Sequence, residues 1–467
     1  AAFRDRLPMA VESEAALPAG VAATARTRGV TGPLLKLAWP VLVERLSLTV
    51  LSAIDAVLVG HYVGTDGLAA VGIGALLFWI PLAGAIAFDV GSTAVVARDV
   101  GAGDHSRVRL GLHAAIVGAA AWGLLCTAVT VLLAPQMMRL MGAEPAVVPL
   151  GARYLRWGSL GFAPLMVLYA VNGSLRGMGN TWLPMLILIA VNVVNAVVAF
   201  TLISGYPFSL GITASGIGYA SAGLTGGVLA LVLAGSRLTP IRLRIRHVFQ
   251  VERAAFRRLG HIGLPVGLEE AQFMLAFMVY TRIVAHLGTD ALAAHAVALR
   301  ALDISILPGF ALGTAATALV GQSLGSDDPE RAEAIGRRAG LFGIGTLLVM
   351  ASLQFMLAPY IVRIFVHDPA VVDTGTKLLR VFAVAMPGLG LQSAIAGALR
   401  GAGDVRYVLG TFTVCAWGIR VPVAALLVLG FGLGAPFAWL AAVLENWARA
   451  VMVGRRFLQG RWKALRV

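Results

Sequence analysis

The octapeptide GSLRGMGN at residues 173–180 recurs 224 residues later as GALRGAGD at residues 397–404. The same shift relates GTDGLAA at 64–70 to GTDALAA at 288–294, and EPAVV at 144–148 to DPAVV at 368–372. With one gap, Pro40 and Glu44 also correspond to Pro265 and Glu269. One shift maintained over more than a hundred residues indicates that the chain is an internal duplication.

The composition indicates that both copies cross a membrane. The 467 residues are 58% hydrophobic and 13% charged, whereas soluble domains carry about 25% charged residues. At about 20 apolar residues per crossing, the chain has room for twelve spans. The predicted spans are 36–60, 68–96, 111–134, 152–174, 182–204, 211–235, 261–286, 291–320, 339–359, 377–399, 407–430 and 436–454. We therefore expect an all-α polytopic membrane protein with twelve transmembrane helices in two pseudo-symmetric six-helix bundles.

Six is an even number, so both copies enter the membrane from the same side as a parallel repeat. The predicted organisation is a disordered cytoplasmic tail (1–33), an N-lobe (34–236), a basic cytoplasmic linker (237–258), a C-lobe (259–460) and a second cytoplasmic tail (461–467).

The distribution of Lys and Arg predicts the orientation. Residues near a span end are counted with the adjoining loop. Of 37 such residues, 27 then fall on the side of the N-terminus (Arg176, Arg400 and Arg449 among them), six on the other side and four in the interior of the spans (Arg45, Arg282, Arg300 and Arg420). Basic loops stay in the cytoplasm, so we expect an inner (plasma) membrane protein with both termini cytoplasmic. The net charge of +14 suits contact with anionic lipid and does not require nucleic acid.

Several short motifs occur in a characteristic order. They are IDAVLVGH at 54–61, VVA at 95–97 before GAGD at 101–104, LVGQSLG at 319–325, and the two LRGxG turns at 175–179 and 399–403. Over residues 33–460 the chain resembles the multidrug and toxic compound extrusion (MATE) family of secondary transporters. The resemblance implies a monomeric antiporter that exports amphipathic, often cationic, organic compounds as protons or sodium ions enter.

Ionisable groups inside a membrane are costly and are therefore functional candidates. Asp55 matches the family's first-helix aspartate, which the resemblance implies binds the coupling ion. Asn195 matches the partner asparagine, and Asn192 lies one turn earlier. The family often has an acid at the position of Ala199, so the choice between proton and sodium stays open. Hydrogen bonding between helices is the alternative role of these residues.

The second half offers a rival ion site. Its charged residues are Glu269, Glu270, Arg300, Asp303, Arg420 and Glu445. Arg300 and Asp303 are one turn apart and can pair. A purely structural salt-bridge network is the alternative. In the first half, Glu44 and Asp89 are candidate gating residues.

Aromatic and Met side chains are candidates for the wall of a cavity that binds flat cations. They are Trp79, Tyr169, Phe273, Met274 and Tyr280, and ordinary packing is the alternative role for each.

Two other functions fit the sequence less well. A flippase for a lipid-linked precursor needs a basic cavity, but acids outnumber Lys and Arg in the interior of the predicted spans. An intramembrane enzyme or sensor needs a catalytic constellation. The chain has no Walker A sequence, no HExxH and no Lys in the interior of a span, so we expect no enzyme, no metal site and no cofactor besides the coupling ion.

Overall fold

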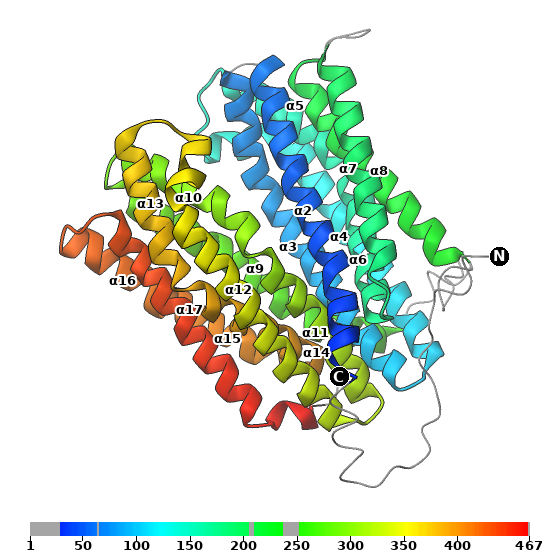
Figure 1. The fold of residues 1–467 in the computed structure, drawn as a ribbon. Helices are drawn as coiled ribbons and strands as arrows, with labels where there is room; N and C mark the ends of the chain where they lie inside the picture. Colours follow the sequence, from blue (N-terminus) through cyan, green and yellow to red (C-terminus); the bar gives the residue numbers. More distant parts are fainter. Residues whose placement is uncertain (1–28, 63–64, 205–209, 237–251, 466–467) are drawn as a thin grey trace.

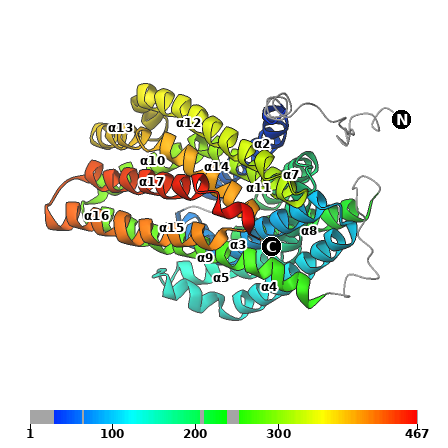
Figure 2. The same ribbon diagram turned by 90° about the horizontal axis from the view of Figure 1, so that it is seen from below.

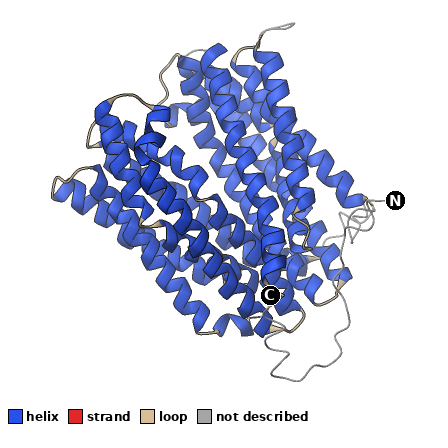
Figure 3. Cartoon of the chain, in the orientation of Figure 1, coloured by secondary structure: helices blue, strands red, loops and turns tan. Residues whose placement is uncertain are grey.

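A computed structural model describes residues 29–62, 65–204, 210–236 and 252–465, without the side chains of residues 51–61 and 65. Within these ranges the chain is helical and contains no strand (Figure 3). The N-lobe contains α2 (Thr31–Tyr62), α3 (Thr65–Gly101), α4 (His105–Leu140), α5 (Val147–Ser159), α6 (Phe162–Gly177), α7 (Trp182–Ile203) and α8 (Ile212–Gly235).

The C-lobe repeats this order. It contains α9 (Arg253–Ala285), α10 (Thr289–Ser305), α11 (Leu307–Gly325), α12 (Pro329–Phe365), α13 (Pro369–Ala383), α14 (Met386–Ala402), α15 (Val405–Cys415), η2 (Ala416–Arg420), α16 (Val421–Ala425), η3 (Leu426–Gly430), α17 (Ala435–Leu458) and η4 (Arg461–Ala464).

The predicted spans correspond to these helices. Seven helical stretches of the described chain are long and apolar enough to cross a membrane, and three bent pairs bring the number to ten. The pairs α5–α6 and α13–α14 each bend by 49°, at equivalent positions of the two lobes, and α10–α11 bends by 44°. The remaining two, α2 and α17, coincide with the first and last predicted spans. The predicted fold class is confirmed.

The lobes meet where α3 crosses α11. A side chain at Gly101 would overlap the carbonyl oxygen of Gln322, and one at Gly325 would overlap that of Arg98. Both contacts obey the 224-residue shift, so equivalent backbone segments touch across the axis that relates the lobes. Only glycine permits such an approach. The two groups of helices converge at this end, near the C-terminus, and spread apart toward the other end (Figure 1). Figure 2 shows the molecule from below, with the C-terminus near the middle of the view.

Polar contacts reinforce the same end. The Arg98 guanidinium donates hydrogen bonds to the carbonyl oxygens of Ala402 (3.3 Å) and Leu465 (2.6 Å). Its repeat equivalent, Gln322, donates to the carbonyl oxygen of Gly177 (2.8 Å). Each lobe therefore caps the C-terminal turn of a helix in the other. Arg258 of α9 also pairs with Asp99 of α3 at 2.6 Å.

Candidate functional site

The N-lobe contains a buried ion cluster that joins three helices. Arg176, in the last turn of α6, pairs with Glu44 of α2 and with Asp89 of α3. All three side chains are buried, with at most 7% of any of them exposed. Two buried carboxylates thus share one guanidinium. Removing this arginine would leave both carboxylates without an ion-pair partner, which strongly destabilises a folded protein.

Close packing of α6 on α3 brings this arginine into reach. A side chain at Gly173 would overlap the carbonyl oxygen of Asp89. The hydroxyls of Ser92 and Thr93 donate hydrogen bonds to α6 carbonyl oxygens at 3.1 and 3.0 Å. The two candidate gating residues, Glu44 and Asp89, are therefore brought together on one partner that lies on a third helix.

The C-lobe contains the equivalent pair within a larger network. Arg400, the counterpart of Arg176, donates to both carboxylate oxygens of Glu269 at 2.8 Å. Arg449 lies 3.7 Å from Glu269 and 3.3 Å from Glu445. Arg420 lies 3.7 Å from Glu445 and 4.5 Å from the centroid of the Tyr280 ring. Three arginines thus compensate two carboxylates, which favours the structural role for Glu269 and Glu445.

Three residues of the predicted C-lobe set stay outside this network. Glu270 is half-buried and forms no ion pair or hydrogen bond with the described part of the chain. Arg300 and Asp303 are both exposed on α10, and in the described part of the chain they form no ion pair with each other. An exposed pair gains little energy against the entropy of its two side chains, so one-turn spacing alone does not bring them together.

The predicted N-lobe ion site lies along α2 and α7. Asn192 donates to Ser47 Oγ at 2.9 Å, and Trp39 meets Trp182 edge-on with ring centroids 4.7 Å apart. These two contacts show that the helices run in parallel. Asn195 is buried on α7. Asp55 belongs to α2, but its side chain lies outside the described residues.

The helical rise places Asp55 along this pair. At 1.5 Å per residue, Asp55 lies about 12 Å beyond Ser47 along α2. Along α7, Asn195 lies about 4.5 Å and Ala199 about 10 Å beyond Asn192. Ala199 is therefore near the level of Asp55, and Asn195 lies between that level and Ser47.

The candidate cavity residues occupy different environments. Tyr280 is buried in the C-lobe core beneath Arg420. Tyr169 lies beside the N-lobe ion cluster, within electrostatic range of Glu44 and Asp89. Phe273 is 38% exposed and stacks on Phe277. Trp79 and Met274 are half-buried.

Three arginines that organise the two clusters, Arg176, Arg400 and Arg449, were not predicted as site residues. They had been counted with the cytoplasmic segments, whereas α6, α14 and α17 continue through them. The repeated Leu-Arg-Gly turn was the available signal, because it places an arginine at equivalent positions of two lobes that also share Glu44 and Glu269. Among the described residues, no three His, Cys, Asp or Glu form a group that could hold a metal ion.

Comparison with known proteins agrees with the family resemblance of the sequence motifs. A family profile described as MatE matches residues 40–201 and 265–426. A Xanthomonas campestris protein described as "Probable multidrug resistance protein NorM" is 31% identical, with 94% of each chain covered. A protein of the same description from Thermotoga maritima is 25% identical, with 92% of each covered.

Solved structures share the fold. A MATE transporter of Vibrio cholerae, VcmN in its bent form, gives a TM-score of 0.84 at 22% identity and covers 93% of this chain and 98% of its own. A structure described as the outward-facing conformation of a multidrug resistance MATE family transporter gives 0.86 at 21% identity, with 96% and 98% covered.

Proposed function

The chain belongs to the MatE family of membrane transporters, and from this premise we propose that it is an ion-coupled antiporter that exports amphipathic, often cationic, organic compounds. As a member of that family it is a transporter and not an enzyme. The drug-resistance descriptions of its relatives favour drug export over flipping of a lipid-linked precursor.

The observation that carries the proposal is the asymmetric meeting of the lobes. The crossing of α3 and α11 and the caps by Arg98 and Gln322 all lie at one end. Rocking of residues 34–236 against residues 259–460, which would open this contact, gives alternating access. The basic residues that flank this end favour the cytoplasmic side for it, and with this orientation the described arrangement is closed toward the cytoplasm.

For the coupling ion we propose Asp55, with Asn192 and Asn195 on the neighbouring helix. A desolvated carboxylate can bind and release a proton, and carboxylate and amide oxygens suit sodium as well. The second candidate is Glu270. It is the one acid of the adjacent Glu269–Glu270 pair whose charge no arginine of the described chain neutralises through an ion pair.

Transport by purified protein in proteoliposomes tests the proposal. Ethidium movement is followed under an imposed proton gradient and then under a sodium gradient, for wild type, Asp55→Asn and Glu270→Gln. Asp290→Asn is the control, because this exposed aspartate lies in the first turn of α10. We expect Asp55→Asn to abolish coupled transport and the control to retain it.

The other outcomes are equally informative. Loss of transport in Glu270→Gln alone moves the coupling site to the C-lobe. If wild type moves no organic cation under either gradient, export of such cations is refuted.

A further inference from the structure

The two lobes meet along two seams that the internal repeat makes equivalent. In the first, α9 of the C-lobe lies against α3 and α4 of the N-lobe. In the second, α2 of the N-lobe lies against α11 and α12 of the C-lobe. We call them the α9–α4 seam and the α2–α12 seam. If the repeat were perfect, the two seams would be packed alike.

The α9–α4 seam is closed by aromatic rings that lie on glycines. A methyl group at Gly118 of α4 would meet the ring of Phe88 at 2.8 Å and that of Phe256, from α9, at 3.1 Å. At Gly84 a methyl group would overlap the indole of Trp122, which donates a hydrogen bond to the Pro81 carbonyl oxygen at 3.4 Å. Gly267 of α9 faces Ala87, with 3.2 Å between the Cβ positions. Aromatic rings therefore pack closely on glycines along this seam and in its N-lobe wall.

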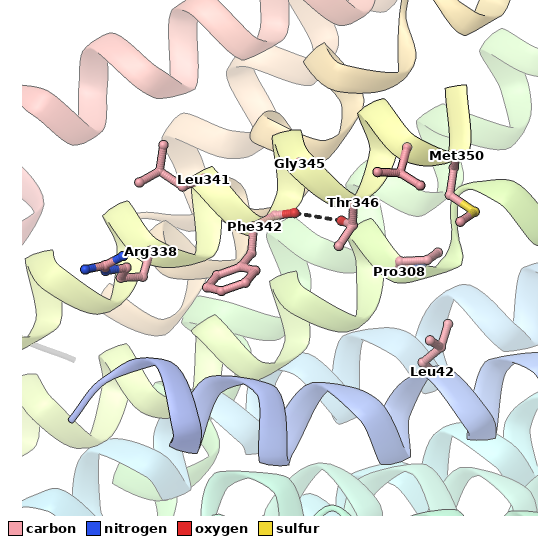
Figure 4. Close-up of a pocket in the computed structure, with 9 residues that line it drawn as sticks. Leu42, Pro308, Arg338, Leu341, Phe342, Gly345, Thr346 and Met350 are labelled. Atoms are coloured by element: carbon pink, nitrogen blue, oxygen red, sulfur yellow. Dashed lines mark hydrogen bonds between the residues drawn. The ribbon is translucent and has the colours of Figure 1, made fainter. Parts of the chain in front are cut away.

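The α2–α12 seam has the opposite residues at the same positions. Phe342 replaces Gly118, and Pro308 and Thr346 replace Gly84 and Trp122. With the one-residue gap, Leu42 replaces Gly267. Side chains now stand where the glycines allowed close approach, and the indole that filled the gap is missing. A groove of about 630 Å³ results, lined by all four of these residues (Figure 4).

The lining of the groove is apolar except at one end. The Thr346 hydroxyl donates a hydrogen bond to the Phe342 carbonyl oxygen at 2.7 Å, so an apolar occupant of the groove does not leave this hydroxyl proton without an acceptor. Arg338 lies at one end of the groove and Met350 at the other (Figure 4). The twelve helical steps from Arg338 to Met350 span about 18 Å, a length suited to an extended hydrocarbon chain.

The position of Arg338 fixes the charge of the occupant. It precedes residues 339–362, which contain no charged residue and span about 36 Å, close to the thickness of a bilayer core. The guanidinium therefore lies at the headgroup level, on the side that we assign to the cytoplasm. Arg338 is exposed and has no ion pair among the described residues, whereas the adjacent Arg337 pairs with Glu333.

We propose that the α2–α12 seam is a binding site for an anionic phospholipid, with one acyl chain in the groove and the phosphate on Arg338. Anionic lipids of the cytoplasmic leaflet are attracted by such basic groups. Leu42 belongs to the N-lobe and the other lining residues to the C-lobe. A bound lipid therefore contacts both lobes and stabilises their present arrangement, independently of which ion drives transport.

Native mass spectrometry tests the site. The full chain is purified in an equimolar mixture of phosphatidylglycerol and phosphatidylcholine, and the lipids retained after detergent removal are counted. We expect wild type to retain phosphatidylglycerol preferentially. Arg338→Gln lowers that preference about fivefold, the equivalent of ~1 kcal/mol for one basic residue at an anionic surface. Arg337→Gln removes the same charge one residue away and leaves the preference unchanged.

A second variant tests the groove itself. Thr346→Trp introduces the indole that Trp122 supplies in the closed seam, and it should remove the retained lipid while unaltered thermal unfolding shows that the fold is intact. Equal retention by Arg338→Gln and Arg337→Gln, or equal retention of both lipids by wild type, overturns the proposal. Displacement of the lipid by ethidium, with tighter ethidium binding in Arg338→Gln, identifies the groove as an entry path for drugs and also overturns it.

Discussion

At the scale of single residues, a few arginines neutralise the buried carboxylates of both lobes. Arg176 is the only arginine that forms ion pairs with Glu44 and Asp89 in the described chain, whereas Glu269 is shared between Arg400 and Arg449. A buried carboxylate without a partner is strongly destabilising. The two repeat-related arginines should therefore differ in importance.

We predict that Arg176→Met lowers the free energy of unfolding by about 3–5 kcal/mol, because it strands two buried carboxylates. Arg400→Met should cost less, since Arg449 still lies 3.7 Å from Glu269. Thermal unfolding in detergent measures the order of the two. The exposed Arg107, which pairs with Asp104 at 3.2 Å, supplies the control Arg107→Met, with an expected change below about 1 kcal/mol. Equal melting temperatures for Arg176→Met and Arg400→Met would contradict the assignment.

At the scale of elements, the crossing of α3 and α11 depends on two glycines. Gly101 and Gly325 each face a backbone carbonyl of the opposing helix, which cannot rotate aside as a side chain can. A methyl group here has to separate the helices. The contact is thus a property of the helix pair, although single residues make it possible.

We predict that Gly325→Ala destabilises the protein by about 1–3 kcal/mol, the range for overpacked sites. Gly260→Ala is the matched control, because nothing lies within 4 Å of a methyl group at this helical position. It should be neutral or stabilising by up to about 1 kcal/mol through helix propensity. Denaturation of both variants side by side measures the two free energies of unfolding. Equal values would show that a methyl group fits at the crossing of α3 and α11.

At the scale of the whole molecule, the proposed alternating access requires the lobes to move relative to each other. The described contacts hold them together along the second half of α3, which packs against α9 from Ala87 onward and against α11 near Gly101. A covalent bond across this contact should therefore stop transport without disturbing either lobe.

We predict that Ala87→Cys combined with Gly267→Cys, made in a Cys126→Ser and Cys415→Ser background, loses transport on oxidation and regains it on reduction. The Cβ positions are 3.2 Å apart, slightly closer than the 3.5–4.5 Å of typical disulfides. Ethidium transport in proteoliposomes is the measurement, and Ala87→Cys alone is the control. Full transport by the cross-linked protein would refute alternating access about this contact.

The site could be predicted only in part. Glu44, Asp89, Glu269 and Glu445 were found because charge inside an apolar span is conspicuous in the sequence. Arg420, a partner of Glu445, was also predicted. Arg176 and Arg400 were not, because they lie at span ends, where arginine is common in membrane proteins whether or not it pairs with a buried acid. The coupling role of Asp55 with Asn192 and Asn195 stays a prediction.

The sequence by itself determined the membrane character, the twelve spans, the parallel duplication and the family, because hydropathy and the 224-residue repeat are read along the chain. Only the tertiary structure decided which charges meet, since Arg176 reaches residues 87 and 132 positions away through the rotation and spacing of three helices. It also decided that rings pack closely on glycines along one seam, whereas its equivalent contains a groove of about 630 Å³. That difference arises because a few exchanges between glycine and large side chains change how closely helices approach.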